Sequence, residues 1–268
     1  MTNTKQTQDD RTIQPFNCST IQRVKAYAFT LAETLIVIGI IGVVAALTLP
    51  NLNHATGDKE KVTKVKKIYA SLTDAVDRAQ AVYGDADTWF NDLAADDYVK
   101  RSERFAKRVT EFMKVSKDCG FGDEFSEGCF SRAPLLEING ERLNYYYDYY
   151  DSLIGKFYMV TLQDGMSLRF GYLGYSYKIG VDIDGTNNGK NQEGNDLFDF
   201  SVYVDKEEAS RRGANINQLY PSAEPNLLTG KYNVLIGNYT TAWVIQNDNL
   251  DYLKCPDELN WETKTSCQ

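Results

Sequence analysis

The sequence predicts an α+β fold in which a long N-terminal helix packs on an antiparallel β-sheet. Two patterns lead to this fold class. Apolar residues recur at helical spacing over residues 62–83, and short β-forming runs separated by turn residues follow from residue 135. Helices followed by strands are typical of an α+β domain. An extra helix and a disulfide-closed C-terminal loop complete the predicted fold.

An apolar segment over residues 29–50 supplies the first half of the long helix. From Leu35 to Leu49 the only polar side chain is that of Thr48. Because a helix of this length extends about 30 Å, the thickness of one hydrocarbon core, the segment is expected to span a membrane once. Small residues spaced three or four apart form a face on which another helix can pack closely. The alternative is that they only face lipid. They are Gly39, Gly42, Ala45 and Ala46.

The second half of the long helix is predicted to be amphipathic. Apolar residues alternate at spacings of three and four, while charged residues occupy the other positions. Because proline lacks an N–H and clashes with the carbonyl four residues earlier, Pro50 is expected to kink the helix between its two halves. The apolar positions are Val62, Val65, Tyr69, Leu72, Val76, Ala79 and Tyr83.

A second helix and several strands are predicted to follow. Asp96 or Asp97 is expected to cap a helix that ends near Lys117. Hairpins are expected around Asn139-Gly140 and Asp164-Gly165, where turn residues separate β-forming runs. Further strands are predicted over residues 177–183, 197–204, 233–237, 241–246 and 251–255.

The cysteines indicate an oxidising compartment. Cys18 precedes the apolar segment, and the other four cysteines follow it. No CxxC pair is present, which argues against a zinc site. Two disulfides are therefore expected, with Cys119/Cys129 and Cys255/Cys267 as the sequence-local pairs, although four cysteines allow three connectivities.

The residues around the start of the apolar segment resemble a known signal. A basic patch and Ala28 precede Phe-Thr-Leu-Ala-Glu, and the apolar run ends in Pro-Asn-Leu. This pattern, over about residues 23–52, resembles the type IV prepilin signal of type IV pilins and of the pseudopilins of type II secretion systems. The resemblance implies cleavage between Ala28 and Phe29 by a prepilin peptidase, and methylation of the new amino terminus at Phe29. The family usually has glycine at the position of Ala28.

The resemblance also implies a domain organisation and a location. Residues 1–28 are a leader removed on maturation, residues 29–50 form the transmembrane and filament-core helix, and residues 51–268 form an extracytoplasmic pilin-like domain. The implied partners are other pilins in a homo- or hetero-oligomeric filament, the prepilin peptidase and an assembly platform in the inner membrane. The protein is expected in the inner membrane with a single pass, and then in a cell-surface or periplasmic filament.

Glu33 is an acid within the apolar segment, and a carboxylate in hydrocarbon is costly enough to suggest a function. Three roles compete: a side chain that only reaches the interface, a proton relay, and recognition of a partner. A relay needs other ionisable groups in the segment, and none is present. Cleavage creates an ammonium at Phe29, so Glu33 of a neighbouring subunit is expected to pair with it and to act as an assembly residue.

A polar loop between two predicted strands is a candidate calcium site. Asp182, Asp184, Thr186 and Glu193 occupy the first, third, fifth and twelfth positions of a calcium loop. The sixth position, where glycine is usual, is Asn187. The alternative interpretation is an ordinary polar hairpin loop. No other cofactor is indicated.

Charge and composition favour a structural role over catalysis. The net charge of −8 argues against nucleic acid as a partner, and His54 is the only histidine, so no Ser/His/Asp or Cys/His set with a second base is available. The predicted function is a pilin or pseudopilin subunit of an extracytoplasmic filament, and no enzyme activity is expected. The alternative is a non-assembling protein, anchored by one helix, that binds calcium or glycans.

Overall fold

The structure is a computed structural model of the chain. It describes residues 31–121, 128–129, 136–138, 140–141, 157–187, 191–222 and 240–267, and within the first of these ranges the side chains of residues 45–56 are not described. The chain divides into two compact units, Met1–Pro50 and Asn51–Gln268.

Helix α1 (Leu31–Tyr83) begins in the first unit. None of the helices in the described part of the chain combines the length and apolar character that crossing a membrane requires. The predicted fold class, with a membrane-spanning half of the N-terminal helix, is therefore wrong.

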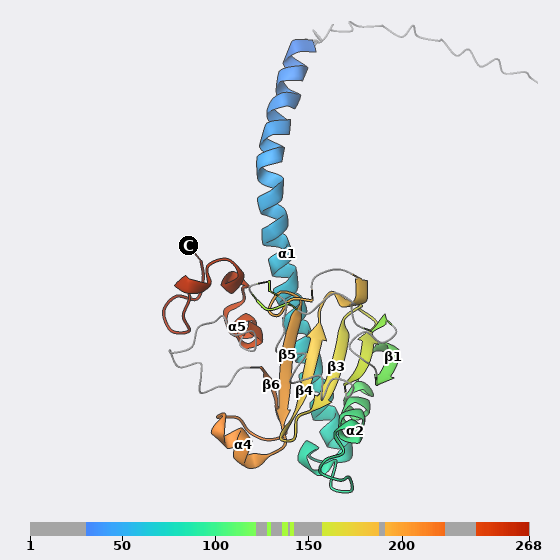
Figure 1. The fold of residues 1–268 in the computed structure, drawn as a ribbon. Coiled ribbons are helices and arrows are strands. Elements are labelled where there is room, and N and C mark those ends of the chain that lie inside the picture. Colours follow the sequence, from blue (N-terminus) through green and yellow to red (C-terminus); the bar gives the residue numbers. More distant parts are fainter. Residues whose placement is uncertain are drawn as a thin grey trace, which may run out of the picture. The chain divides into compact units, whose positions relative to one another are not determined.

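The second unit is built on a six-stranded antiparallel sheet in which the strands pair in sequence order (Figure 1). Each strand therefore lies beside the strand that precedes it in the chain. The strands are β1 (Val115–Phe121), β2 (Tyr158–Leu162), β3 (Ser167–Tyr172), β4 (Ser176–Asp182), β5 (Leu197–Tyr203) and β6 (Leu219–Pro221).

The part of α1 in the second unit packs on one face of the sheet (Figure 1). Tyr83, the last apolar position of the predicted stripe, is exposed. Val65, Leu72, Val76 and Ala79 are fully buried and Tyr69 is half-buried, as the spacing of three and four predicts. They meet the inward side chains of the strands, among which Phe200 stacks on Tyr69 with ring centroids 5.8 Å apart. Val62 at one end of this stripe and Ala79 at the other are separated by about 26 Å along the helix.

Helix α2 (Tyr98–Thr110) covers the same face next to α1. The side chain of Asp97 caps it by accepting a hydrogen bond from the Lys100 N–H at 3.0 Å. Phe105 stacks on Tyr177 of β4 with ring centroids 4.2 Å apart. The predicted end near Lys117 is wrong, because the chain leaves the helix after Thr110 and enters β1.

Two predicted strands near the C-terminus are wrong. Residues 241–246 lie in helix α5 (Thr240–Asn247), and residues 251–255 form a 3-10 turn, η6 (Asp251–Leu253). In α5 the residues from Thr240 to Val244 are all buried, because the helix packs between the sheet and the C-terminal segment. A short run that is apolar on all sides does not distinguish a strand from a buried helix.

The remaining elements are short. They are η1 (Ala86–Thr88), η3 (Gly185–Asn187), α4 (Lys206–Arg211) and η7 (Pro256–Glu258). The hairpin predicted around Asn139-Gly140 and the strand predicted over residues 233–237 lie wholly or mainly outside the described residues.

Candidate functional site

The first turns of α1 expose apolar side chains to solvent. Leu31 is 80% exposed, and Leu35 and Ile38 are exposed by more than 60%. At Gly39 and Gly42 no atom lies within 4 Å of the position that a Cβ would take, so this side of the helix is open to another chain. An exposed apolar surface of this kind indicates a site of interaction.

Glu33 lies in the first turn of α1, beside these exposed apolar residues. A carboxylate at this end of a helix is stabilised by the N–H groups of the first turn. Ala28 and Phe29, the predicted cleavage site, lie outside the described residues, as does the side chain of Pro50. The roles of Phe29, Glu33 and Pro50 therefore stay predictions.

Three of the predicted calcium ligands lie close together in sequence: Asp182 ends β4, and Asp184 and Thr186 follow it in the connection to β5. The fourth, Glu193, lies shortly before β5. Asp182 is fully buried, and its Oδ1 accepts hydrogen bonds from the N–H groups of Asp184 at 3.2 Å and Gly185 at 2.9 Å. Its Oδ2 is buried and has no hydrogen-bond partner among the described residues. Gly185 has a φ of 71°, and a Cβ there would overlap the carbonyl oxygen of Gly165, so only glycine fits this turn.

Buried carboxyl groups surround this connection, and their pKa values are raised. Burial, with the Asp184 carboxyl beside it, raises the pKa of Asp182 to about 8. Burial raises the pKa of Glu193 to about 7, with the Asp199 carboxylate adding to the effect. Burial also raises the pKa of Asp196 to about 7, although Asp196 Oδ1 accepts a hydrogen bond from the Gln192 N–H at 2.5 Å.

These acids are not arranged as a metal site. In the part of the chain that the structure describes, no group of three or more acidic, histidine or cysteine side chains is placed to hold a metal ion. Asp182 directs one oxygen to the backbone of its own turn, as an ordinary polar loop does. The structure therefore shows no cluster of acidic ligands around Asp182 among the described residues, and calcium binding by Asp182, Asp184, Thr186 and Glu193 stays a prediction.

Sequence reasoning missed two features of this region. Asp196 is 3% exposed and belongs to the same group of buried acids, but it lies outside the calcium-loop spacing. Lys61 of α1 donates a hydrogen bond to Asn195 Oδ1 at 2.5 Å across 134 residues of chain. Only the tertiary structure brings these two residues together, so no local pattern signals the contact.

A second charged group lies on the sheet face opposite α1. Lys178 Nζ is 3.0 Å from Asp199 Oδ2, and the Arg169 guanidinium is 3.8 Å from Asp199 Oδ1. Burial alone would raise the pKa of Asp199, but these two cations overcome it and lower the pKa below its usual range. Gly180 makes room for this arrangement, because a Cβ there would overlap the Arg169 side chain.

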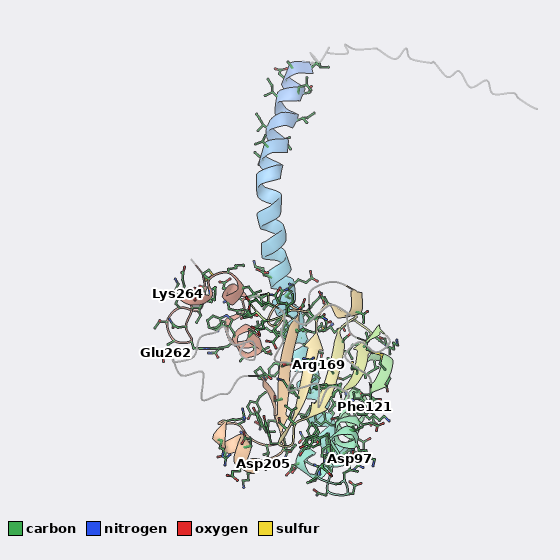
Figure 2. The ribbon with its side chains drawn as sticks, in the orientation of Figure 1. Asp97, Phe121, Arg169, Asp205, Glu262 and Lys264 are labelled. Carbon is green, nitrogen blue, oxygen red and sulfur yellow. A yellow bond between two sulfur atoms is a disulfide. The ribbon has the colours of Figure 1, made fainter. Side chains whose placement is uncertain are left out.

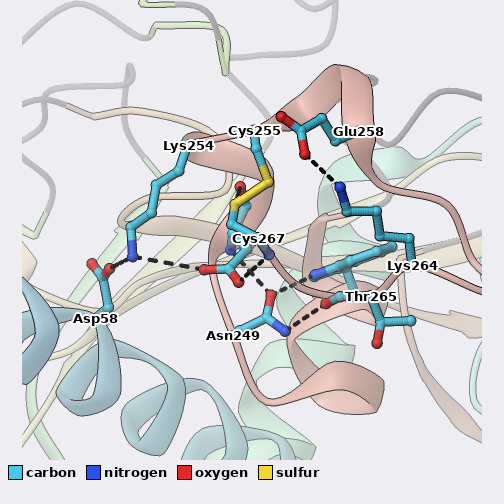
Figure 3. The surroundings of a disulfide bond; sticks show 10 residues. Asp58, Asn249, Lys254, Cys255, Glu258, Lys264, Thr265 and Cys267 are labelled. Carbon is cyan, nitrogen blue, oxygen red and sulfur yellow. Dashed lines mark hydrogen bonds and ion pairs between the residues drawn. A yellow bond between two sulfur atoms is a disulfide. The ribbon is translucent and has the colours of Figure 1, made fainter.

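The C-terminal segment, residues 255–267, is closed by a disulfide between Cys255 and Cys267 (Figure 3). Trp261 packs edge-on against Trp243 of α5 with ring centroids 4.8 Å apart. The Cys267 N–H donates to Asp251 Oδ2 at 2.8 Å. Another disulfide joins Cys119 to Cys129. The structure thus pairs the sequence-local cysteines.

Ion pairs tie α1 to elements on its two sides. Lys254, next to the C-terminal disulfide, lies 2.6 Å from Asp58 of α1 (Figure 3), and Lys66 pairs with Asp248 on the same side. The neighbouring Lys67 instead reaches Asp164 in the β2–β3 turn at 2.7 Å.

Comparisons with family models, with curated proteins and with solved structures found no match to this chain.

Proposed function

We propose that the protein is a structural subunit, a pilin or pseudopilin, of an extracytoplasmic filament, and that it assembles through its N-terminal helix after cleavage before Phe29. The observation that carries this proposal is the sequence around the cut. Ala28, Phe29 and Glu33 stand at the spacing of a type IV prepilin signal, and Glu33 lies in the first turn of a helix whose first apolar side chains are exposed.

The exposed apolar side chains of residues 31–44 support assembly through this helix. Packing of neighbouring helices removes such side chains from water, at roughly 25 cal/mol per Å² of apolar surface. Gly39 and Gly42 allow a neighbouring backbone to approach closely. A contact between different surfaces of identical subunits that does not close into a ring grows a filament.

Glu33 gives this packing its register. The new ammonium at Phe29 of one subunit pairs with Glu33 of a neighbour, so that each charge is compensated where water is excluded. The pairing requires an axial offset between the two helices, because the two charges lie four positions apart on each chain. The same requirement makes the assembly depend on prior cleavage, since an uncut chain has no ammonium at Phe29.

The proposal names partners and a compartment. The partners are a prepilin peptidase, other pilins and an assembly platform of the inner membrane. Filament growth outside the cytoplasm agrees with the two disulfides, because disulfides persist in oxidising compartments.

Replacement of Glu33 tests the proposal. The Glu33→Ala chain is expected to be cut before Phe29, as mass spectrometry of its N-terminus would show, and to form no filaments by electron microscopy. The control is Glu60→Ala, which removes an acid of α1 whose ion pair within the described residues is with Lys64, one turn along the same helix. Filaments of normal length from Glu33→Ala would contradict the assembly role. An uncut N-terminus and a monodisperse wild-type chain would favour the alternative of a non-assembling binding protein.

A further inference from the structure

A hollow of about 520 Å³ lies beside α1, at the edge of the second unit where β1 begins and β2 ends. Ile68 and Leu162 are buried and form part of its apolar lining, and Phe112 and Met113 contribute partly buried apolar side chains. The remaining lining residues are polar or charged and stand at the rim: Lys67, Ser71, Asp74, Lys114, Gln163 and Asp164.

Among the described residues, the charges at the rim leave one cation without an ion pair. Lys67 pairs with Asp164 at 2.7 Å, and Asp74 pairs with Arg78 at 3.5 Å. Arg78 in turn lies over the ring of Phe112, 4.9 Å from its centroid. Lys114 is exposed and forms no ion pair with the described residues. The hollow therefore favours a segment that places a carboxylate next to a small apolar surface.

The C-terminal segment offers such carboxylates. Asp257 and Glu262 are exposed and form no ion pairs with the described residues, whereas Glu258 between them pairs with Lys264 at 2.5 Å. Trp261 and the disulfide hold this segment in a defined shape against α5. Its two unpaired acids are therefore presented from a rigid surface.

The hollow and the acidic segment lie at opposite edges of the domain. The hollow adjoins β1, the first strand of the sheet, while α5 and the C-terminal segment adjoin β5 and β6 at the other end. In Figure 2 Glu262 and Lys264 lie across the domain from Phe121, the last residue of β1. Because the two surfaces differ, one chain cannot bring them together within itself, but two copies can.

We propose that the hollow binds the C-terminal segment 255–267 of a second copy of this chain, with Lys114 opposite Asp257 and Glu262. The inference rests on the proposed function and deepens it, because it names a contact between the globular parts of neighbouring subunits. Charge complementarity selects the partner: an unpaired cation stands at one edge and unpaired acids stand at the other. Such a contact between unlike edges repeats from subunit to subunit and suits a filament.

Carbodiimide coupling tests the contact directly, because it joins a lysine amine to a carboxylate that touches it. Full-length processed chains, half of them labelled with ¹⁵N, are mixed, assembled and coupled. Peptides that join Lys114 to Asp257 or Glu262 are expected, with one labelled and one unlabelled partner. In the Glu33→Ala background at high protein concentration the same peptides are expected, because this contact does not use Glu33.

Charge exchange tests the energetics. Lys114→Glu replaces attraction by repulsion and is expected to weaken self-association, measured by sedimentation, roughly tenfold. Adding Asp257→Lys and Glu262→Lys to that variant is expected to restore it. Lys59→Glu, an equal charge change at an exposed lysine of α1 away from the hollow, is the matched control and is expected to have no effect.

The experiments distinguish a refutation of the proposed contact from a refutation of the filament function. If the mixed-label peptides are absent from both wild-type and Glu33→Ala chains, and Lys114→Glu behaves like Lys59→Glu, the contact is overturned even where filaments form. If the peptides appear although no filaments form, the contact stands and the filament function fails.

Discussion

Asp182 is a carboxyl group whose two oxygens have different surroundings. Oδ1 accepts hydrogen bonds from two backbone N–H groups, while Oδ2 is buried with no partner in the described part of the chain, so the protonated form is favoured. Burial raises the pKa values of Asp182, Glu193 and Asp196 to about 8, 7 and 7. A raised pKa in the folded state adds stability that is present near pH 4 and is lost as the pH rises through 7 and 8.

The substitution Asp182→Asn is expected to remove part of this pH dependence. Asparagine keeps the Oδ1 acceptor and carries no charge at any pH, so it avoids ionising a buried group. The melting temperature of the wild type is expected to fall between pH 5 and pH 8.5, and that of the variant to fall less. At pH 8.5 the variant is expected to melt about 2–6 °C higher.

The control for this experiment is Asp77→Asn, which changes an exposed acid of α1. A variant less stable than wild type at pH 8.5 would contradict the prediction.

The same samples test the candidate calcium loop. If Asp182 binds calcium, calcium raises the melting temperature of the wild type and not of the variant, and chelator reverses the effect. If calcium and chelator both leave the wild type unchanged, the calcium assignment is wrong.

Gly180 is a position where one added methyl group is expected to be costly. Its missing Cβ makes room for the middle of the Arg169 side chain, which cannot shift without leaving Asp199. Gly180→Ala is expected to lower the free energy of unfolding by about 1–3 kcal/mol, measured by urea denaturation. Gly57→Ala, at a glycine of α1 with no atom within 4 Å, serves as the control and should not destabilise the fold.

Among the elements, those with a clear period were predictable. The stripe of α1 from Val62 to Ala79 follows a helical period and is buried as expected. The Asp164-Gly165 turn joins β2 to β3 because glycine there adopts a φ of 90°. Asp97 was one of two expected caps, and it is the cap observed. In each case a local feature decides the local structure.

Elements defined by tertiary packing were not predictable. The run around Trp243 is rich in β-forming residues, yet it is a helix because it is enclosed between the sheet and the C-terminal segment. β1 was missed because none of its side chains is fully buried and two register irregularities interrupt its pairing with β2. Neither feature leaves a period in the sequence.

The disulfide between Cys255 and Cys267 is expected to stabilise the C-terminal segment. It closes a loop of 12 residues, and chain-entropy arguments assign such a loop about 3 kcal/mol. The double variant Cys255→Ser/Cys267→Ser is expected to melt about 5–10 °C lower. Amide hydrogen exchange should accelerate from residue 249 onwards, because Asn249 hydrogen-bonds to Thr265 within this segment.

The matched variant is Cys119→Ser/Cys129→Ser, which opens a loop of 10 residues near β1. It is expected to lose a similar amount of stability without changing exchange after residue 249. Equal exchange in both double variants would contradict a local role for the C-terminal disulfide.

At the scale of the molecule, the candidate assembly residues near the N-terminus could be predicted from the sequence, whereas the candidate binding surface at Lys114 could not. The prepilin-like residues around Phe29 and Glu33 form a contiguous motif, so a single sequence displays them. The hollow at Lys114 is assembled from a helix, a connection between elements and a turn, which are separated by up to about 100 residues of chain. That Lys114 forms no ion pair with the described residues can be recognised only once the ion pairs of its neighbours are known.

The arrangement of α1 on its sheet also determines how the second unit responds to mechanical load. A pull along the axis of this helix acts in shear on the whole buried stripe from Val62 to Ala79, so its contacts resist together. A pull across the axis would peel them apart one after another. Lys66 and Lys67 add ionic attachments on opposite flanks of the helix, which oppose rolling as well as sliding. The second unit is thus strongest against a pull along the axis of α1.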